Sequence, residues 1–156
     1  MALSRRSMLW IVPGATLAVP LGALLLPRDG QAAQVNADRG IAVRGTDVVA
    51  YVTEGRPVAG RADFTHAWRG ATWRFASAAH RDLFAADPER YAPAFGGFCA
   101  FAVSEGYTAP IDPAAWRIVD GRLFLNYDRS VQRRWEADIP GRIARGDANW
   151  PALAAR

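Results

Sequence analysis

Cys99 is the residue best suited to chemistry, because it is the only cysteine and stands in a glycine-containing segment, FGGFCAF at 95–101. Two adjacent glycines permit backbone conformations with positive φ and let another segment or a ligand come close. Free backbone N–H groups beside a sulfur favour the thiolate and lower the thiol pKa. The opposing expectation is an inert core cysteine, because cysteine is often buried and its neighbours here are aromatic.

His66 and His80 complete the set of soft or borderline metal ligands, because both methionines, Met1 and Met8, stand near the N-terminus. The histidines are 14 residues apart, and the chain has neither the H-x-x-H nor the C-x-x-C spacing of common zinc sites. If the strand with His66 folds onto the helix with His80, both approach Cys99 in a mixed nitrogen and sulfur site suited to copper or zinc. Otherwise His66 is an exposed strand residue and His80 a helix-face residue near solvent.

Asp47 and Tyr51 stand four residues apart in a β-prone run, DVVAYV at 47–52, which places them on one face of a predicted strand. Asp47 is suited to orient a histidine or to accept from the backbone, and Tyr51 to lie in the core with its hydroxyl at the rim. We predict structural roles for both. A tryptophan platform for a sugar or cofactor would require clustering, whereas core positions are expected for Trp68, Trp73, Trp116, Trp135 and Trp150.

The elements that position the histidines are predicted from local signals. Apolar and polar residues alternate over 64–68 and 72–75 on either side of Arg69-Gly70-Ala71, which predicts a hairpin. Ser77 is a suitable N-cap for a helix that runs to about Asp87, with a second short helical turn from Pro88.

Beyond Cys99, the Asp120-Gly121 pair between 116–119 and 122–126 predicts a second hairpin with a type I′ turn. From Asp128 the pattern becomes helical, and Pro140 with Gly141 is expected to interrupt it before a short helix to about Arg145. The fold class is α+β: a small single domain of short antiparallel strands and hairpins with two or three helices.

The N-terminus predicts export. Ser4-Arg5-Arg6-Ser7-Met8-Leu9 resembles the twin-arginine export motif, and an apolar run with two prolines follows to Leu26. Small residues precede a cut after Ala32, so residues 1–32 are predicted to be a signal peptide, and the mature protein periplasmic or otherwise exported and soluble. The alternative is an uncleaved membrane anchor, since 8–26 is just long enough to span a bilayer. Residues 33–44 are expected to be an irregular lead-in to a domain at 45–153.

Composition narrows the possible functions. The net charge is +4, with 19 basic residues that are all arginine, but half of that excess comes from the signal segment. The remaining arginines alternate with acids, which excludes nucleic-acid binding. The chain beyond the signal is long enough for one hydrophobic core. A single cysteine sent to an oxidising compartment cannot form an internal disulfide, so its thiol is buried, reactive, metal-bound or linked to another chain.

Five segments together resemble the exported YHS-domain proteins, over about Gly40 to Trp150. The segments are GTDVVAY at 45–51, WRGATWRF at 68–75, DPERYAP at 87–93, GGFCA at 96–100 and GRLFLNY at 121–127. The resemblance implies a YHS-like fold, and relatives with selenocysteine at the position of Cys99 imply chemistry at that sulfur. YHS domains are linked to copper and mercury handling, some with further cysteine ligands. A monomer with one cysteine cannot form an all-cysteine site.

Three functions follow as hypotheses. The leading one is a binding module, rather than an enzyme, that holds a soft metal ion, most plausibly copper, through Cys99 with His80 or His66. The second is a redox protein whose Cys99 thiolate attacks a peroxide or disulfide and is restored by an external thiol. The third is a structural or interaction domain with an inert cysteine. The partners expected are a metal ion or a small thiol or peroxide, a second copy joined through Cys99, and a membrane only if the signal is uncleaved.

Overall fold

The computed structural model describes residues 35–156, so the predicted signal peptide at 1–32 lies outside the described residues. The structure confirms an α+β fold, and this part of the chain contains six α-helices rather than two or three. The elements, with two 3₁₀ turns labelled η, are β1 (Ala37–Asp38), β2 (Ile41–Ala42), η1 (Val43–Gly45), α1 (Val48–Thr53), β3 (Arg61–Trp68), β4 (Ala71–Phe75), α2 (Ala78–Ala86), α3 (Pro88–Tyr91), η2 (Ala94–Gly97), α4 (Ala100–Ser104), β5 (Asp112–Val119), β6 (Arg122–Asn126), α5 (Arg129–Glu136) and α6 (Ile139–Ala154).

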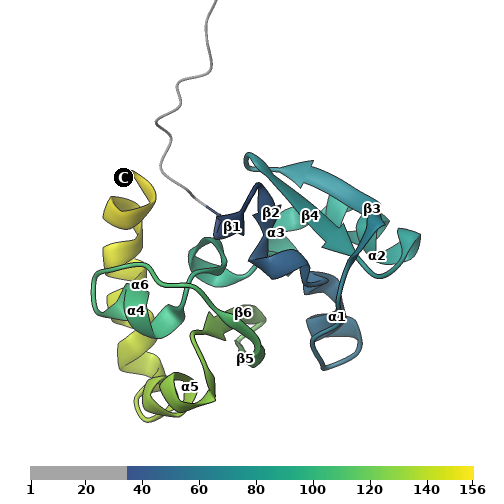
Figure 1. Ribbon diagram of the computed structural model, residues 1–156. Helices are drawn as coiled ribbons and strands as arrows, with labels where there is room; N and C mark the ends of the chain where they lie inside the picture. Colours follow the sequence, from purple (N-terminus) through teal and green to yellow (C-terminus); the bar gives the residue numbers. More distant parts are fainter. Residues whose placement is uncertain (1–34) are drawn as a thin grey trace, which may run out of the picture.

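The N-terminal part, residues 37–91, is built on a four-stranded sheet with the order β1-β2-β4-β3 (Figure 1). β3 and β4 form the first predicted hairpin and pair antiparallel, while β2 pairs parallel with β4. Arg69 and Gly70 at its turn have φ angles of 49° and 74°, both positive as a type I′ turn requires. The hairpin prediction is confirmed.

Helix α2 packs on this sheet and begins where the sequence predicted. The Ser77 hydroxyl accepts a hydrogen bond from the backbone N–H of His80 at 3.1 Å, as an N-cap does. One helical turn later, the buried ring of Phe84 lies 5.0 Å from that of Trp73 and 5.1 Å from that of Phe75. These contacts fix the first turn of α2, and with it His80, against the sheet.

The C-terminal part, residues 94–154, consists of the β5–β6 hairpin and the helices α4 to α6. Asp120 and Gly121 have φ angles of 50° and 76°, so the second predicted hairpin and its type I′ turn are confirmed. The carboxylate of Asp128 accepts from the N–H of Val131 at 2.7 Å and caps α5, also as predicted. Figure 1 shows α4 lying beside α6 in this part.

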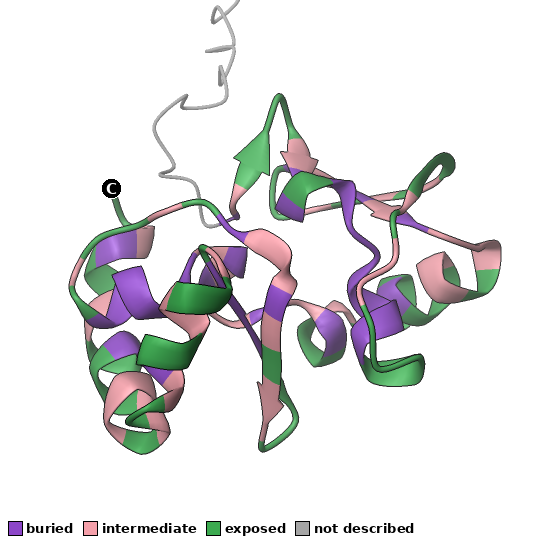
Figure 2. Cartoon of the chain, turned by 60° about the horizontal axis from the view of Figure 1, so that its bottom comes forward, coloured by how far each residue is buried: buried purple, intermediate pink, exposed green. Residues whose placement is uncertain are grey.

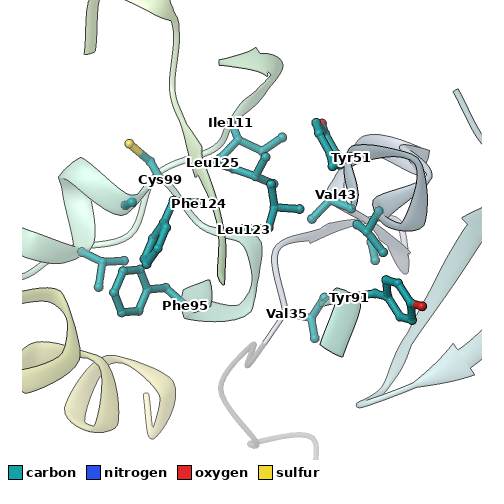
Figure 3. Packing of buried hydrophobic residues seen from close by; sticks show 14 of the residues in the cluster. Val35, Val43, Tyr51, Tyr91, Phe95, Cys99, Ile111, Leu123, Phe124 and Leu125 are labelled. Atoms are coloured by element: carbon teal, nitrogen blue, oxygen red, sulfur yellow. The ribbon is translucent and has the colours of Figure 1, made fainter. Parts of the chain in front are cut away.

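One hydrophobic core joins the two parts. Buried residues run through both of them rather than gathering in one (Figure 2). In Figure 3, Leu123 of β6 lies between the residues of η2 and those of η1 and α1. The boundary between the N-terminal and C-terminal parts, which we call the seam, also contains direct contacts of Tyr51. Its hydroxyl donates to the carbonyl of Pro113 at 2.8 Å, and its ring lies 5.1 Å from that of Trp116. The fold is therefore a single unit.

The predicted strand at 47–52 is wrong, because Val48–Thr53 form helix α1. Asp47 is its N-cap: Oδ1 accepts from the N–H groups of Val49 and Ala50 at 2.9 and 3.3 Å. Capping and burial of the valines against the core outweigh the modest β preference of these residues.

The predicted break between the last two helices exists but lies at Ala137 and Asp138 rather than at Pro140 and Gly141, and α6 runs unbroken for 16 residues from Ile139 instead of ending at about Arg145. Asp138 caps it by accepting from the N–H of Gly141 at 3.0 Å. Pro140 occupies the first turn, where a missing N–H costs no helical hydrogen bond.

The end of α6 extends beyond Arg145, where the helix was expected to stop, and is held by tertiary contacts around Pro151. Nδ2 of Asn149 donates to the carbonyl of Val103 at 3.0 Å, and Trp150 packs 6.0 Å from Phe95. Packing thus maintains the last turns despite the proline. No helix among residues 35–156 is long and apolar enough to cross a membrane.

The lead-in expected at 33–44 is not irregular throughout. Residues 37–42 form the β1–β2 hairpin, and Ala42 and Val43 are fully buried. The small apolar side chains at 42 and 43 reach the core because the parallel pairing of Ile41 with Thr72 places this segment against β4.

Candidate functional site

Cys99 follows the 3₁₀ turn η2 and stands at the N-terminus of α4. Gly96 and Gly97 have positive φ angles of 60° and 80°, the freedom that the sequence suggested. A Cβ on Gly97 would lie 2.4 Å from Cγ1 of Val43, so this glycine admits another chain segment, not a ligand. Gly97 thus accounts for the close packing of η2 against Val43 of η1.

The Cys99 sulfur lies in the core. The residue is 1% exposed, and Figure 3 shows it beside Phe124 and Leu125 of β6. Its Sγ lies 3.7 Å from Oδ1 of Asn126, to which the S–H donates. Burial raises the pKa of the thiol, while backbone N–H groups that include that of Ala102 act in the opposite direction. The protonated thiol is therefore favoured over the reactive thiolate.

His80 is fixed through both ring nitrogens. Nδ1 lies 2.7 Å from Oδ2 of Asp47, and Nε2 lies 3.3 Å from Oγ1 of Thr53. The same Asp47 oxygen accepts from the N–H of Ala76 at 2.9 Å, so the buried carboxylate joins the start of α1, the end of β4 and the first turn of α2. Asp47 does orient a histidine and accept from the backbone, the structural role that the sequence indicated.

His66 lies in the middle of β3 and is half-buried. Its ring meets the edge of Phe84 at a centroid distance of 6.0 Å. His66 faces α2 along with Phe64 and Trp68, which alternate with exposed residues of the strand. The ring packs against the sheet's helix-covered face, so the fully exposed position considered for it is wrong.

The structure does not gather Cys99, His66 and His80 into one site. The described residues contain no group of three or more His, Cys, Asp or Glu side chains that could hold a metal ion. Cys99 belongs to the C-terminal part with α4, whereas both histidines belong to the N-terminal part with β3 and α2 (Figure 1). Copper binding through Cys99 and a histidine remains a prediction. The linkage of two chains through Cys99 would require this buried sulfur to reach the surface.

A cleft of about 300 Å³ lies between the two parts of the fold. We call it the aromatic cleft because Trp68, Trp73, Phe95 and Trp150 contribute to its walls. The rings form pairs: Trp68 and Trp73 are 5.7 Å apart, and Phe95 and Trp150 are 6.0 Å apart. Trp73 is only 1% exposed, so the ring surface open to a ligand comes from the half-buried Trp68 and Trp150, which only the tertiary fold brings to one cleft.

Charged side chains surround these rings. Arg69 pairs with Glu89 at 2.6 Å, and its guanidinium lies 4.4 Å from the ring centroid of Trp68. Arg122 pairs with Asp147 through two hydrogen bonds of 2.7 and 3.1 Å, and this pairing raises the pKa of Arg122.

Arg90 is the remaining cation of the aromatic cleft, with no ion pair to any carboxylate of the described residues. Its guanidinium lies 5.5 Å from the ring centroid of Tyr91. The charged lining therefore comprises three guanidinium groups and two carboxylates, which leaves an excess of positive charge. No local pattern in the sequence connects Arg90, Arg122 and Asp147, so their convergence on one cleft could not be predicted from it.

Comparison of the chain with protein-family models, with curated proteins and with solved structures gives no match. The resemblance to exported YHS-domain proteins therefore remains a prediction from its five segments.

Proposed function

We propose that this protein is a small binding module that holds an anionic ligand with a flat apolar body in the aromatic cleft. The observation that carries the proposal is the convergence of three tryptophans and an excess of arginine on one cavity. Ligand sites of small proteins typically combine apolar walls with a few charged or polar groups that fix orientation.

The aromatic walls supply affinity for the ligand body. Trp68 and Trp150 both line the cleft and come from different parts of the fold, one from β3 and the other from α6. Aromatic pairs contribute about 0.5–1.5 kcal/mol beyond their buried area. A flat ring between these walls would gain such contacts on both faces.

The arginines supply selection for negative charge. Arg69 and Arg122 are already paired with Glu89 and Asp147, so they bring little net charge to a ligand. Arg90 has no such partner in the described part of the chain and is free to pair with a carboxylate of the ligand. We therefore assign anion recognition to Arg90.

In this proposal Cys99 is a packing residue, the third of the hypotheses drawn from the sequence. The support is its burial and the raised pKa of its thiol, which both oppose attack on a peroxide or capture of copper. The YHS resemblance and export are retained as proposals that concern the family and the destination of the module, independent of the cleft.

The test is a titration of the protein with 1-naphthoate, followed by the indole N–H signals in ¹H–¹⁵N NMR spectra. Saturable shifts of the signals of Trp68, Trp73 and Trp150 are expected. The matched ligand 1-naphthylmethylamine has the same ring system with a positive charge and should bind at least about tenfold more weakly.

Two arginine variants test whether Arg90 is responsible for the preference for the anionic ligand. Arg90→Gln should reduce the preference for the anion, while Arg133→Gln, an exposed arginine on α5, should leave it unchanged. Equal binding of both ligands, or shifts confined to Trp116 and Trp135 outside the cleft, would overturn the proposal.

A further inference from the structure

Three arginines line a second, open hollow formed by residues of β1, β2, η1 and β4 and of the turn between β1 and β2. Its walls are formed by Arg39, Arg44 and Arg74 with Asp38 and Ile41, and its volume is about 550 Å³. We call it the arginine hollow. None of its lining residues lines the aromatic cleft.

The arginines reach the hollow from three elements. Arg39 stands in the turn between β1 and β2, Arg44 in η1 and Arg74 in β4. The parallel pairing of Ile41 with Thr72 brings β2 beside β4. The stem of Arg74 passes beside Gly45, where an added Cβ would make an ordinary van der Waals contact of 3.5 Å with Cδ of Arg74.

Backbone geometry does not explain why two of these residues are arginine. Arg39 and Arg44 have positive φ angles of 49° and 58°, a region in which asparagine and glycine are favoured among the residues. The backbone conformation at positions 39 and 44 therefore gives no reason for arginine, and the charge of the side chain is what distinguishes arginine there.

The three guanidinium groups lack carboxylate partners. Residues 35–156 form eight arginine–carboxylate ion pairs and the His80–Asp47 contact, and none of these includes Arg39, Arg44 or Arg74. Arg44 donates to the carbonyl of Ile111 at 3.3 Å, and the buried Nε of Arg74 has no hydrogen-bond acceptor among the described residues. Three like charges in one hollow repel one another, and a buried donor without an acceptor is costly.

We propose that the arginine hollow binds a phosphate group. Guanidinium forks match phosphate oxygens in pairs, and a tetrahedral oxyanion offers enough oxygens for three arginines, whereas a carboxylate is satisfied by one or two. Bound phosphate would compensate the excess of three guanidinium charges over the carboxylate of Asp38, through the exposed ends of the arginines rather than through the buried Nε of Arg74. This site is independent of the aromatic cleft and of the function proposed for it.

The experiment is a titration with inorganic phosphate at constant ionic strength, with acetate as the comparison anion. The arginine Nε–H and the Gly40 and Gly45 backbone signals are followed by ¹H–¹⁵N NMR. Saturable shifts with phosphate and at least tenfold weaker binding of acetate are expected. Equal responses to phosphate and acetate would overturn the proposal, because they would reflect general screening.

Arg39→Asn and Arg44→Asn are the informative variants, because asparagine tolerates the left-handed backbone while it removes the charge. Each should weaken phosphate binding about tenfold, the loss expected for one charge-assisted hydrogen-bonded contact. Arg133→Gln on α5 is the matched control and should bind phosphate like the unaltered protein. Unchanged affinity in both asparagine variants, with folding verified by the dispersion of the same spectra, would overturn the proposal.

Vesicles distinguish the source of the phosphate group. Co-sedimentation with phosphatidylglycerol–phosphatidylcholine vesicles that is lost in Arg39→Asn would support a lipid headgroup. Phosphate binding without co-sedimentation would support a free phosphate compound. If the protein neither co-sediments with the vesicles nor binds inorganic phosphate, the proposed phosphate site is rejected.

Discussion

Nδ1 of His80 lies 2.7 Å from Oδ2 of Asp47, whose side chain has no exposed surface. The other oxygen of this carboxylate caps α1, so one side chain serves the starts of two helices. A buried carboxylate in such a network stabilises the fold only while all its donors remain in place.

Replacement of Asp47 by alanine should lower the free energy of unfolding by about 3 kcal/mol, because it leaves three backbone N–H groups and the imidazole without their acceptor. Asp87→Ala is the matched control: it removes an exposed N-cap from α3 and should cost about 1 kcal/mol. Urea denaturation followed by tryptophan fluorescence measures both. Similar losses in the two variants would show that the buried network adds nothing beyond capping.

The Cys99 thiol should be unreactive in the folded protein. Because burial raises its pKa, iodoacetamide should modify the native chain much more slowly than the urea-unfolded chain at pH 8. Mass spectrometry over a time course gives both rates. Rapid native modification would instead favour the thiol redox or copper function and would contradict the packing role proposed for Cys99.

The same pKa shift predicts a dependence of stability on pH. Above about pH 8.5 the cysteine of the unfolded chain ionises while that of the folded chain stays protonated. The unfolded state then binds fewer protons, so stability falls as pH rises. The loss between pH 7 and 9.5 should be smaller in Cys99→Ser, which lacks the titrating thiol. Parallel stability curves for the two proteins would refute this assignment.

Gly146 is predicted to be required by packing. A Cβ on this residue of α6 would lie 2.5 Å from Cζ of Phe95, which also lines the aromatic cleft. Gly146→Ala should therefore cost about 1–3 kcal/mol through overpacking, although alanine is the better helix former by about 1 kcal/mol. Ala144→Gly, at an exposed position of the same helix, should lose only the helix propensity. Thermal denaturation compares the variants, and a stabilised Gly146→Ala would show that Phe95 yields without cost.

Removal of a carboxylate from the aromatic cleft should improve anion binding. Asp147→Asn leaves Arg122 without its ion-pair partner, so 1-naphthoate should bind about three times more tightly at low salt. Asp82→Asn, which unpairs Arg81 outside the cleft, should have no effect. The gain should shrink in about 0.5 M salt, where exposed charges are screened. An unchanged affinity would indicate that the naphthoate carboxylate points away from Arg122.

Local signals predicted much of the fold. Both hairpins depend on glycine turns such as Asp120-Gly121, and the capping residues Ser77 and Asp128 mark true helix starts. These features depend on a few consecutive residues, so the sequence contains nearly all the information that determines them.

Helix α1, predicted as a strand, and the C-terminal half of α6, beyond its predicted end near Arg145, depend on longer-range contacts. The valine-rich segment of α1 has the composition of a strand, and its helical state depends on burial and on the cap at Asp47. The last turns of α6 include Pro151 and are maintained by the contacts of Asn149 and Trp150 with other elements. Propensity gives no indication of such contacts.

The candidate site was the least predictable feature. Trp68, Arg90, Arg122 and Trp150 come from β3, α3, β6 and α6, and their convergence depends on the whole topology. The sequence pointed to Cys99, His66 and His80 as site residues. The fold buries Cys99 and places it in a different part from the two histidines. Orientation of a histidine was one of the structural roles predicted for Asp47, and the structure shows that this histidine is His80.

The hydrogen bond from Tyr51 to Pro113 has a consequence for how a ligand would enter the aromatic cleft. Together with the bonds from Arg44 to Ile111 and from Asn36 to Gly97, it fastens the two parts of the fold along their seam. Proteins that close around a ligand do so by a hinge motion between two parts. Such a motion here would require these three hydrogen bonds to break. The cleft is therefore expected to be preorganised, so that little conformational entropy is lost when a ligand binds. The specificity for a ligand then depends on how well its shape fits the cleft of the free protein.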